Sequence, residues 1–233
     1  MCVWRRGSAL SGRARGPSPH GQCHRVSLRT TSHHTARVMR IFIGIDLDAE
    51  VRARISRFLE GVQGFAPEAR WVRPESLHIT LKFIGEQTPE QVEAITERLG
   101  RVEGSAFEIN MSGYGFFPTV KAPRVFWIGI RAGPELATLA ERVDLAVAEL
   151  GIAREDRAYS PHLTLARAGG RSGSPKWRKG DRPNAVFAVL DKRLAAIGEL
   201  DFGSMTAREF VLYQSQLSAL GSKYTKLQRF PLS

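Results

Sequence analysis

The sequence predicts an α+β fold made of two similar halves, each with one strand that carries a histidine. In several segments apolar residues occupy every second position, as in a half-buried strand, and between them they recur at helical spacing. The tetrapeptide His-X-Thr-Leu occurs twice, at residues 78–81 and 162–165, each time within a segment of strand alternation. Two copies of one motif on two strands indicate two related halves.

Composition limits the classes of function. The 233 residues suffice for one large domain or two small lobes with cores of their own. The formal charge of +11 suggests a nucleic-acid binder, but residues 1–38 contain seven of the 34 basic residues and no acidic one. The other 27 basic residues stand against 23 acidic ones, so residues 39–233 are only mildly basic. That balance favours a polyanionic partner without requiring one.

Residues 1–38 differ from the rest of the chain. They hold both cysteines, Cys2 and Cys23, so residues 39–233 have no thiol for a disulfide, a nucleophile or a metal site, which suits a reducing cytoplasm. No apolar run is long enough to span a membrane. We expect residues 1–38 to be a disordered basic N-terminal extension, or a stretch upstream of a true start at Met39. An organelle transit peptide or an RNA-tethering tail is less favoured, and residues 39–233 are the expected two-lobed domain.

The first half is predicted to contain a strand, a helix, a histidine strand and a second helix. Residues 41–47 alternate as a core strand, and a helix at 49–62 follows Asp48, a good N-cap. Residues 77–83 form the first histidine strand. Residues 88–91, Thr-Pro-Glu-Gln, have the sequence of a capping box. The predicted buried stripes of the two helices comprise Val51, Ile55, Leu59, Val62, Val92, Ile95, Leu99 and Val102.

The second half repeats this alternation. Strands are predicted at 106–111 and 124–130, separated by a turn or bulge at 113–118 that is rich in Gly and aromatic residues and ends in Pro118. A third helix is expected from Pro134 to Gly151. Its apolar stripe is Leu136, Leu139, Val143, Val147 and Leu150. The remaining predictions are the second histidine strand at 161–165, a fourth helix at 184–197, and strands at 209–217 and 223–230 joined by a hairpin turn at 219–222.

The histidine strands are the candidate functional elements. Strict alternation puts His78, Thr80 and Lys82 on a polar face, and Phe83 on the apolar face with the core. His162 and Thr164 have the same spacing as the first pair. A single histidine on a strand is more often structural than catalytic, but the other four histidines all precede Met39. They are His20, His24, His33 and His34.

Two histidines suit the opening of a cyclic phosphodiester. The reaction needs a base to deprotonate the attacking water and an acid to protonate the leaving oxygen, and imidazole can serve as either near neutral pH. The hydroxyls of Thr80 and Thr164 are placed to donate hydrogen bonds to phosphate oxygens. The residues alone do not assign the acid and the base. Residues 39–233 show no metal-ligand cluster and no Gly-rich phosphate loop, so we expect no metal, no cofactor and no ATP-dependent ligase.

From Met39 onward the chain resembles the 2H (two-histidine) phosphoesterase superfamily, specifically the RNA 2′,3′-cyclic phosphodiesterase (2′-5′ RNA ligase) family. The segments that carry the resemblance are 39–46, 77–85, 123–129, 160–167, 212–217 and 221–224. The resemblance implies two pseudo-symmetric lobes of antiparallel sheet with outer helices and an active-site cleft between them. It further implies that His78 protonates the leaving O3′, that His162 activates water, and that the product is a 2′-phosphate.

Arg167 matches an arginine that follows the second motif in this family and could neutralise phosphate charge. By alternation Arg167 falls on the face opposite His162, so a bulge or strand end must redirect it; otherwise it is a solvated surface arginine. The segment 167–182 is basic and contains Trp177, so it could clamp RNA, although its Gly and Ser content equally suits a mobile loop. Its basic residues are Arg167, Arg171, Lys176, Arg178, Lys179 and Arg182.

The expected partner is therefore an RNA with a 2′,3′-cyclic phosphate end, bound by a monomer. Reversible 2′-5′ ligation, in which a 5′-hydroxyl replaces water, would need no cofactor. Two alternatives stay open: a phosphodiesterase for a small cyclic nucleotide or a 2′-5′ oligonucleotide, and a non-catalytic module that binds RNA ends. Pocket size and the basic segment would separate the substrates.

Overall fold

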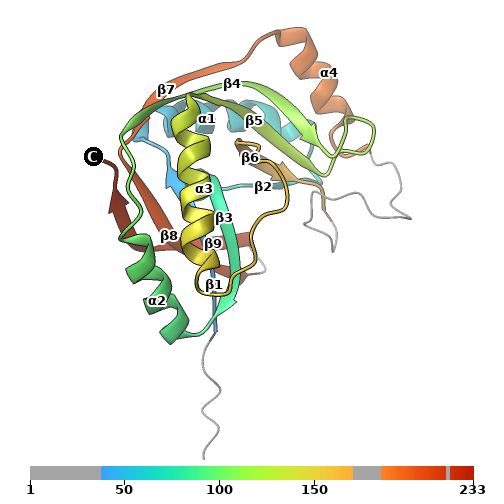
Figure 1. Cartoon of the computed structure of the whole chain (residues 1–233). Coiled ribbons are helices and arrows are strands. Elements are labelled where there is room, and N and C mark those ends of the chain that lie inside the picture. Colours follow the sequence, from blue (N-terminus) through green and yellow to red (C-terminus); the bar gives the residue numbers. More distant parts are fainter. Residues whose placement is uncertain (1–37, 170–184, 219–220) are drawn as a thin grey trace, which may run out of the picture. The chain divides into compact units, whose positions relative to one another are not determined.

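The structure, a computed structural model, describes residues 38–169, 185–218 and 221–233. The predictions for the N-terminal extension, for most of the basic segment 167–182 and for the centre of the hairpin turn lie outside these residues. The described part contains two antiparallel sheets and four α-helices (Figure 1). The α+β architecture predicted from the sequence is confirmed.

Each sheet contains one histidine strand. The four-stranded sheet has the order β3-β1-β8-β9 and the five-stranded sheet the order β2-β6-β5-β4-β7. The strands of the first are β1 (Met39–Asp46), β3 (His78–Gln87), β8 (Glu209–Ser218) and β9 (Gly221–Pro231). Those of the second are β2 (Arg70–Trp71), β4 (Phe107–Phe117), β5 (Val125–Ala132), β6 (His162–Arg167) and β7 (Asp201–Ala207). The two C-terminal strands complete the sheet that β1 begins, so the four-stranded sheet joins both ends of the domain and the five-stranded sheet comes from the chain between them.

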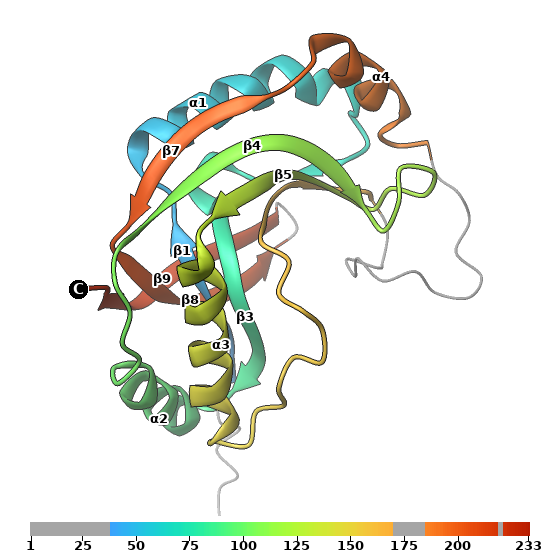
Figure 2. The same ribbon diagram turned by 45° about the horizontal axis from the view of Figure 1, so that its top comes forward.

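The helices pack across the sheets. The α-helices are α1 (Ala49–Val62), α2 (Pro89–Leu99), α3 (Pro134–Ala148) and α4 (Ala188–Ile197), and two short 3-10 helices are η1 (Gln63–Phe65) and η2 (Pro74–Ser76). Figure 2 shows α1 along β7 of the five-stranded sheet, and α3 beside β3. The stripes of α1, α2 and α3 thereby join one continuous apolar core. No helix among the described residues is long and apolar enough to cross a membrane.

The predicted helix starts have the expected caps. The Asp48 carboxylate accepts from the backbone N–H of Val51 at 2.8 Å, which satisfies a donor left free at the start of α1. Thr88 and Gln91 form the reciprocal capping box of α2. At Gly151 the chain turns with φ +83° after α3, a conformation that glycine adopts without strain.

Several boundaries differ from the prediction. Helix α4 begins at Ala188 rather than at 184, and Leu150 lies beyond α3 with 40% of its surface exposed. Strand β4 continues through the predicted turn to Phe117, with a bulge at Gly113, whose φ is +68°. Strand β7 was not predicted because Gly203, with φ +86°, interrupts its alternation.

Candidate active site

The two histidine strands lie next to each other although they belong to different sheets. Strands β3 and β6 are in contact, and the Tyr159 hydroxyl, just before β6, donates to the backbone carbonyl of Thr80 at 3.0 Å. His78 and Thr80 of β3 and His162 and Thr164 of β6 are all partly exposed, while the leucines that alternate with them are buried. The fold therefore brings the two motifs together.

Both histidines are oriented by the same hydrogen bond. The Nδ1 atom of His78 lies 2.7 Å from the carbonyl oxygen of Ser76, and the Nδ1 atom of His162 lies 2.8 Å from that of Ser160. A carbonyl oxygen can only accept, so Nδ1 carries the hydrogen in each ring. The Nε2 atom of each neutral imidazole is left as the basic nitrogen, available for proton exchange.

Each histidine strand has a β-bulge at the leucine of its motif. Gly44 and Ile43 of β1 face Thr80 and Lys82, so one residue of β3 is extra. Strand β5 shows the same shift, from Thr164 to Ala166 of β6. A bulge puts one additional residue into a strand and reverses the faces of the residues that follow.

The bulge overturns two predictions about the first motif. Phe83, assigned to the core by strict alternation, has 65% of its surface exposed, whereas Lys82, assigned to the polar face with His78, is 5% exposed. The Lys82 ammonium group binds a carboxylate oxygen of Asp144 at 2.5 Å and the backbone carbonyl of Ala153 at 2.7 Å. Lys82 therefore has a structural role, because it connects β3 to α3 and to the segment that follows α3.

In the second motif the bulge provides the redirection that Arg167 needs. Ala166 is fully buried and Arg167 is partly exposed, the reverse of simple alternation. The positive charge of Arg167 lowers the pKa of both His78 and His162, so its guanidinium lies within electrostatic reach of both rings. An arginine near two imidazoles can neutralise a bound phosphate.

Burial favours the neutral form of both histidines. The pKa of His78 is lowered to about 4, chiefly by burial. The charges of Arg167 and Arg52 act in the same direction, and the Ser76 carbonyl and Asp46 oppose them. Burial also lowers the pKa of His162, with Arg167 acting in the same direction and the Ser160 carbonyl opposing. Near pH 7 both free imidazoles are uncharged.

Aromatic rings supply that burial. The ring of Phe42 lies 4.6 Å from that of His78, and Tyr224 meets the His78 ring edge-on at 5.1 Å. Beside His162, Phe117 stands edge-on at 5.0 Å and Trp127 at 6.4 Å. Each histidine thus has an apolar wall that excludes water from part of its surface.

Among the described residues, no group of three or more His, Cys, Asp or Glu side chains could hold a metal ion.

The residues that strand alternation missed are those that hold the motifs in place, including Lys82, Tyr159 and Arg52. The sequence contains one signal for the bulge. Arg167 lies five residues after His162, and an odd spacing puts two residues on opposite faces of a regular strand. Strict alternation cannot accommodate that arginine on the histidine face.

Known proteins are similar to this chain in sequence and in fold. A model of the family described as LigT-like phosphoesterase matches residues 45–127. A protein of Archaeoglobus fulgidus named RNA 2′,3′-cyclic phosphodiesterase is 34% identical over 192 residues, which cover 82% of this chain and 99% of that protein. A protein of the same name from Escherichia coli is 31% identical over 197 residues, or 83% of this chain and 97% of that protein.

A solved structure agrees with these relatives. The crystal structure of E. coli LigT complexed with 3′-AMP superposes with a TM-score of 0.63 at 28% identity, covering 84% of this chain and 99% of that one. Sequence identity, coverage and fold lead to one conclusion, and the chain belongs to the LigT-like phosphoesterase family.

Proposed function

We propose that this enzyme hydrolyses the 2′,3′-cyclic phosphate end of RNA to a 2′-phosphomonoester without a metal ion. The observation that carries the proposal is the pairing of His78 and His162 on contacting strands, with matched Nδ1 hydrogen bonds and Arg167 within electrostatic reach of both. The name of its relatives, RNA 2′,3′-cyclic phosphodiesterase, supplies the substrate class.

In the proposed reaction each histidine transfers one proton. The Nε2 atom of His162 takes a proton from water as the water oxygen forms a bond to phosphorus. The bond from phosphorus to O3′ breaks, and His78 gives its Nε2 proton to O3′, which becomes the free hydroxyl. His78 must be protonated when the substrate is bound. The negative charge of the bound phosphate favours this form because it raises the pKa of His78.

The local charges do not choose between the two histidines. At His78 the carboxylate of Asp46 favours the protonated form, whereas the charges of Arg167 and Arg52 favour the neutral form. Among the described charged groups, only Arg167 shifts the pKa of His162 by its charge, and it favours the neutral form that a base requires. The assignment of His78 as the acid and His162 as the base follows from the family resemblance.

The phosphate is held by Thr80, Thr164 and Arg167 in this proposal. The threonines share a face with the histidines, and Arg167 donates in a fork that suits phosphate oxygens. The exposed ring of Phe83, whose centroid lies 6.0 Å from that of Phe42, offers a face on which a base can stack. Its place in the first motif corresponds to that of Arg167 in the second.

The test is turnover of a short RNA that ends in a 2′,3′-cyclic phosphate, with EDTA present. We expect the native enzyme to yield a 2′-phosphate, and His78→Ala and His162→Ala each to lose at least about 10²-fold in kcat. His34→Ala, outside the motifs, is the matched control. Phosphorus NMR against authentic 2′- and 3′-phosphates identifies the product.

Other outcomes would contradict this proposal in different ways. Binding without turnover would indicate a module that binds RNA ends, and a need for a divalent metal would exclude the two-histidine mechanism. Faster turnover of a cyclic mononucleotide or a 2′-5′ oligonucleotide would change the substrate. Adding an RNA with a 5′-hydroxyl tests ligation, in which that hydroxyl replaces water as the nucleophile. Gel filtration tests the expected monomer, and cell fractionation tests the expected cytoplasmic location.

A further inference from the structure

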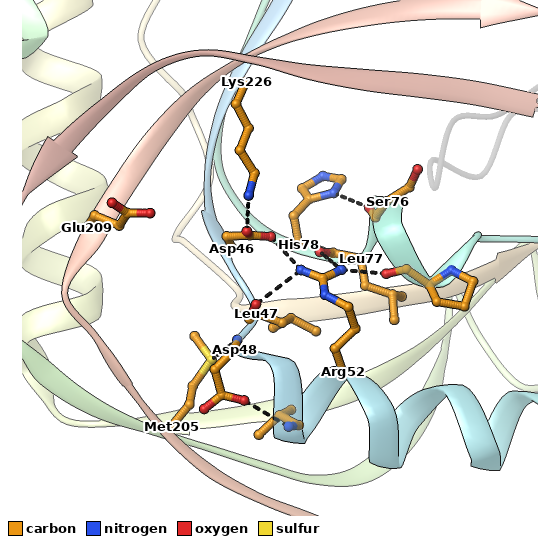
Figure 3. A network of polar contacts seen from close by, with 12 residues as sticks. Asp46, Leu47, Asp48, Arg52, Ser76, Leu77, His78, Met205, Glu209 and Lys226 are labelled. Carbon is orange, nitrogen blue, oxygen red and sulfur yellow. Dashed lines mark hydrogen bonds and ion pairs between the residues drawn. The ribbon is translucent and has the colours of Figure 1, made fainter.

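Arg52 lies at the centre of a polar network below His78. It projects from α1, and its guanidinium donates to the carboxylate of Asp46, the last residue of β1, at 2.6 Å and to the carbonyl of the next residue, Leu47, at 3.1 Å (Figure 3). Asp46 is itself the residue of β1 that pairs with His78 across the sheet. The other oxygen of its carboxylate binds the Lys226 ammonium group of β9.

The same guanidinium binds the turn that precedes His78. Its Nη1 atom donates to the carbonyl of Pro74, at the start of η2, and lies 3.4 Å from the carbonyl of Leu77, just after it. Between these two residues lies Ser76, whose carbonyl accepts from Nδ1 of His78. Arg52 therefore holds both ends of the turn that orients the imidazole, as the dashed contacts in Figure 3 show.

The surroundings make this arrangement specific to arginine. Four acceptors from two segments converge on one planar group, and the side chains of Arg52 and Asp46 are only about one-fifth exposed, at 21% and 20%. A lysine has a single ammonium group and cannot span acceptors spread in this way. At the second motif, the segment that leads to His162 is held by the Tyr159 hydroxyl, which donates to the backbone carbonyl of Thr80.

We propose that Arg52, held by Asp46, is a positioning residue for His78. It fixes the turn 74–77 so that the Ser76 carbonyl keeps the hydrogen of the neutral ring on Nδ1 and leaves Nε2 for proton exchange with O3′. The inference rests on the proposed function, because it gives His78 its role in the reaction. The charge of Arg52 also lowers the pKa of His78, together with Arg167 and against Asp46, and this effect is separate from positioning. Tyr213 and Tyr224 are the other titratable groups beside the ring.

Two substitutions separate geometry from charge. Arg52→Met removes both the charge and the hydrogen bonds, whereas Arg52→Lys keeps the charge and cannot span the acceptors. We expect both to lower kcat by about 10²-fold, as small displacements of a catalytic group do, with KM changed less than twofold. The matched control is Arg54→Met on the same helix, because Arg54 also binds one carboxylate, of Glu50, and one carbonyl, of Phe202.

A second measurement does not depend on turnover. Nitrogen-15 NMR of the imidazole side chains, with His162→Gln used for assignment, reports which ring nitrogen of His78 carries hydrogen. We expect Nδ1–H in the native enzyme and a mixture of tautomers in Arg52→Met and Arg52→Lys, with Arg54→Met unchanged. This signal exists even if the enzyme turns over no RNA, so failure of the proposed function is distinguishable from failure of the inference.

Three results would overturn the inference. An Arg52→Lys enzyme with native kcat beside an impaired Arg52→Met enzyme would make the role one of charge. An unchanged His78 tautomer in both variants would remove the positioning role. Equal losses in Arg52→Met and Arg54→Met, matched by equal losses of thermal stability, would make Arg52 a general support of α1.

Discussion

The hydroxyl of Tyr159 donates a hydrogen bond to the backbone carbonyl of Thr80 across 3.0 Å. Tyr159 lies three residues before His162 in the chain, and Thr80 lies two residues after His78. The bond therefore joins the first histidine motif to the segment that leads into the second. Burial raises the pKa of Tyr159, so the hydroxyl remains a donor throughout the pH range of enzyme assays.

We expect Tyr159→Phe to lower the free energy of unfolding by about 1 kcal/mol, the usual net value of one hydrogen bond. It should also lower kcat, because the segment before His162 loses an anchor on β3. Urea denaturation and steady-state kinetics measure the two effects. Tyr114→Phe, in the interior of the five-stranded sheet, controls for loss of a tyrosine hydroxyl elsewhere, and equal effects at both positions would argue against a special link.

The bulge in β3 predicts opposite results for two neighbouring apolar residues. Leu81 is buried, so Leu81→Ala should cost about 2–5 kcal/mol of stability. Phe83 is exposed, so Phe83→Ala should change stability by less than about 0.5 kcal/mol. Denaturant titration of both variants decides the matter, and a large loss for Phe83→Ala would restore the core assignment made from alternation.

Lys82 and Asp144 form a buried ion pair between β3 and α3, and Lys82→Met should cost about 3 kcal/mol because it leaves a buried carboxylate with less compensation. Arg101→Met, which breaks the exposed pair of Arg101 with Glu97, should cost less than about 1 kcal/mol. Chemical denaturation compares the two. The double variant Lys82→Met with Asp144→Leu should regain most of the stability, and failure to do so would give Lys82 another role.

The pKa of Asp144 adds a pH dependence to this pair. Burial alone would raise that pKa, but the bonds from Lys82 and Arg154 outweigh burial and hold it below its ordinary value of 3.8. The stability from the pair is therefore present above about pH 4 and is lost as pH falls through the lowered pKa of the folded state.

His78 predicts a second pH effect on stability. Its pKa is about 4 in the folded state and 6.5 in the unfolded chain, so between these values the unfolded chain binds the additional proton. Stability should fall as pH drops from 6.5 to 4. Denaturation at several pH values should show that the free energy of unfolding depends less steeply on pH in His78→Gln than in the native protein. An identical pH dependence in both proteins would place the His78 ring in water.

Apolar periodicity, the repeated motif and the capping residues suffice to predict the α+β class, three of the four α-helices to within three residues at either end, and both histidine strands. These features depend on neighbours in the chain, such as the Asp48 cap on Val51 or the alternation from Leu77 to Thr80. The functional candidates followed from the same local pattern, because a histidine and a threonine two residues apart share a strand face.

Only tertiary structure decided what lies beyond the leucine of each motif. A bulge arises from pairing with a neighbouring strand, β1 for Thr80 and Lys82 and β5 for Thr164 and Ala166, and one chain segment carries no record of its partner's register. That pairing sends Lys82 inward to Asp144 and turns Phe83 and Arg167 outward. The supports of His78 likewise come from distant segments, because Arg52 reaches its acceptors only once α1, β1 and η2 are packed together.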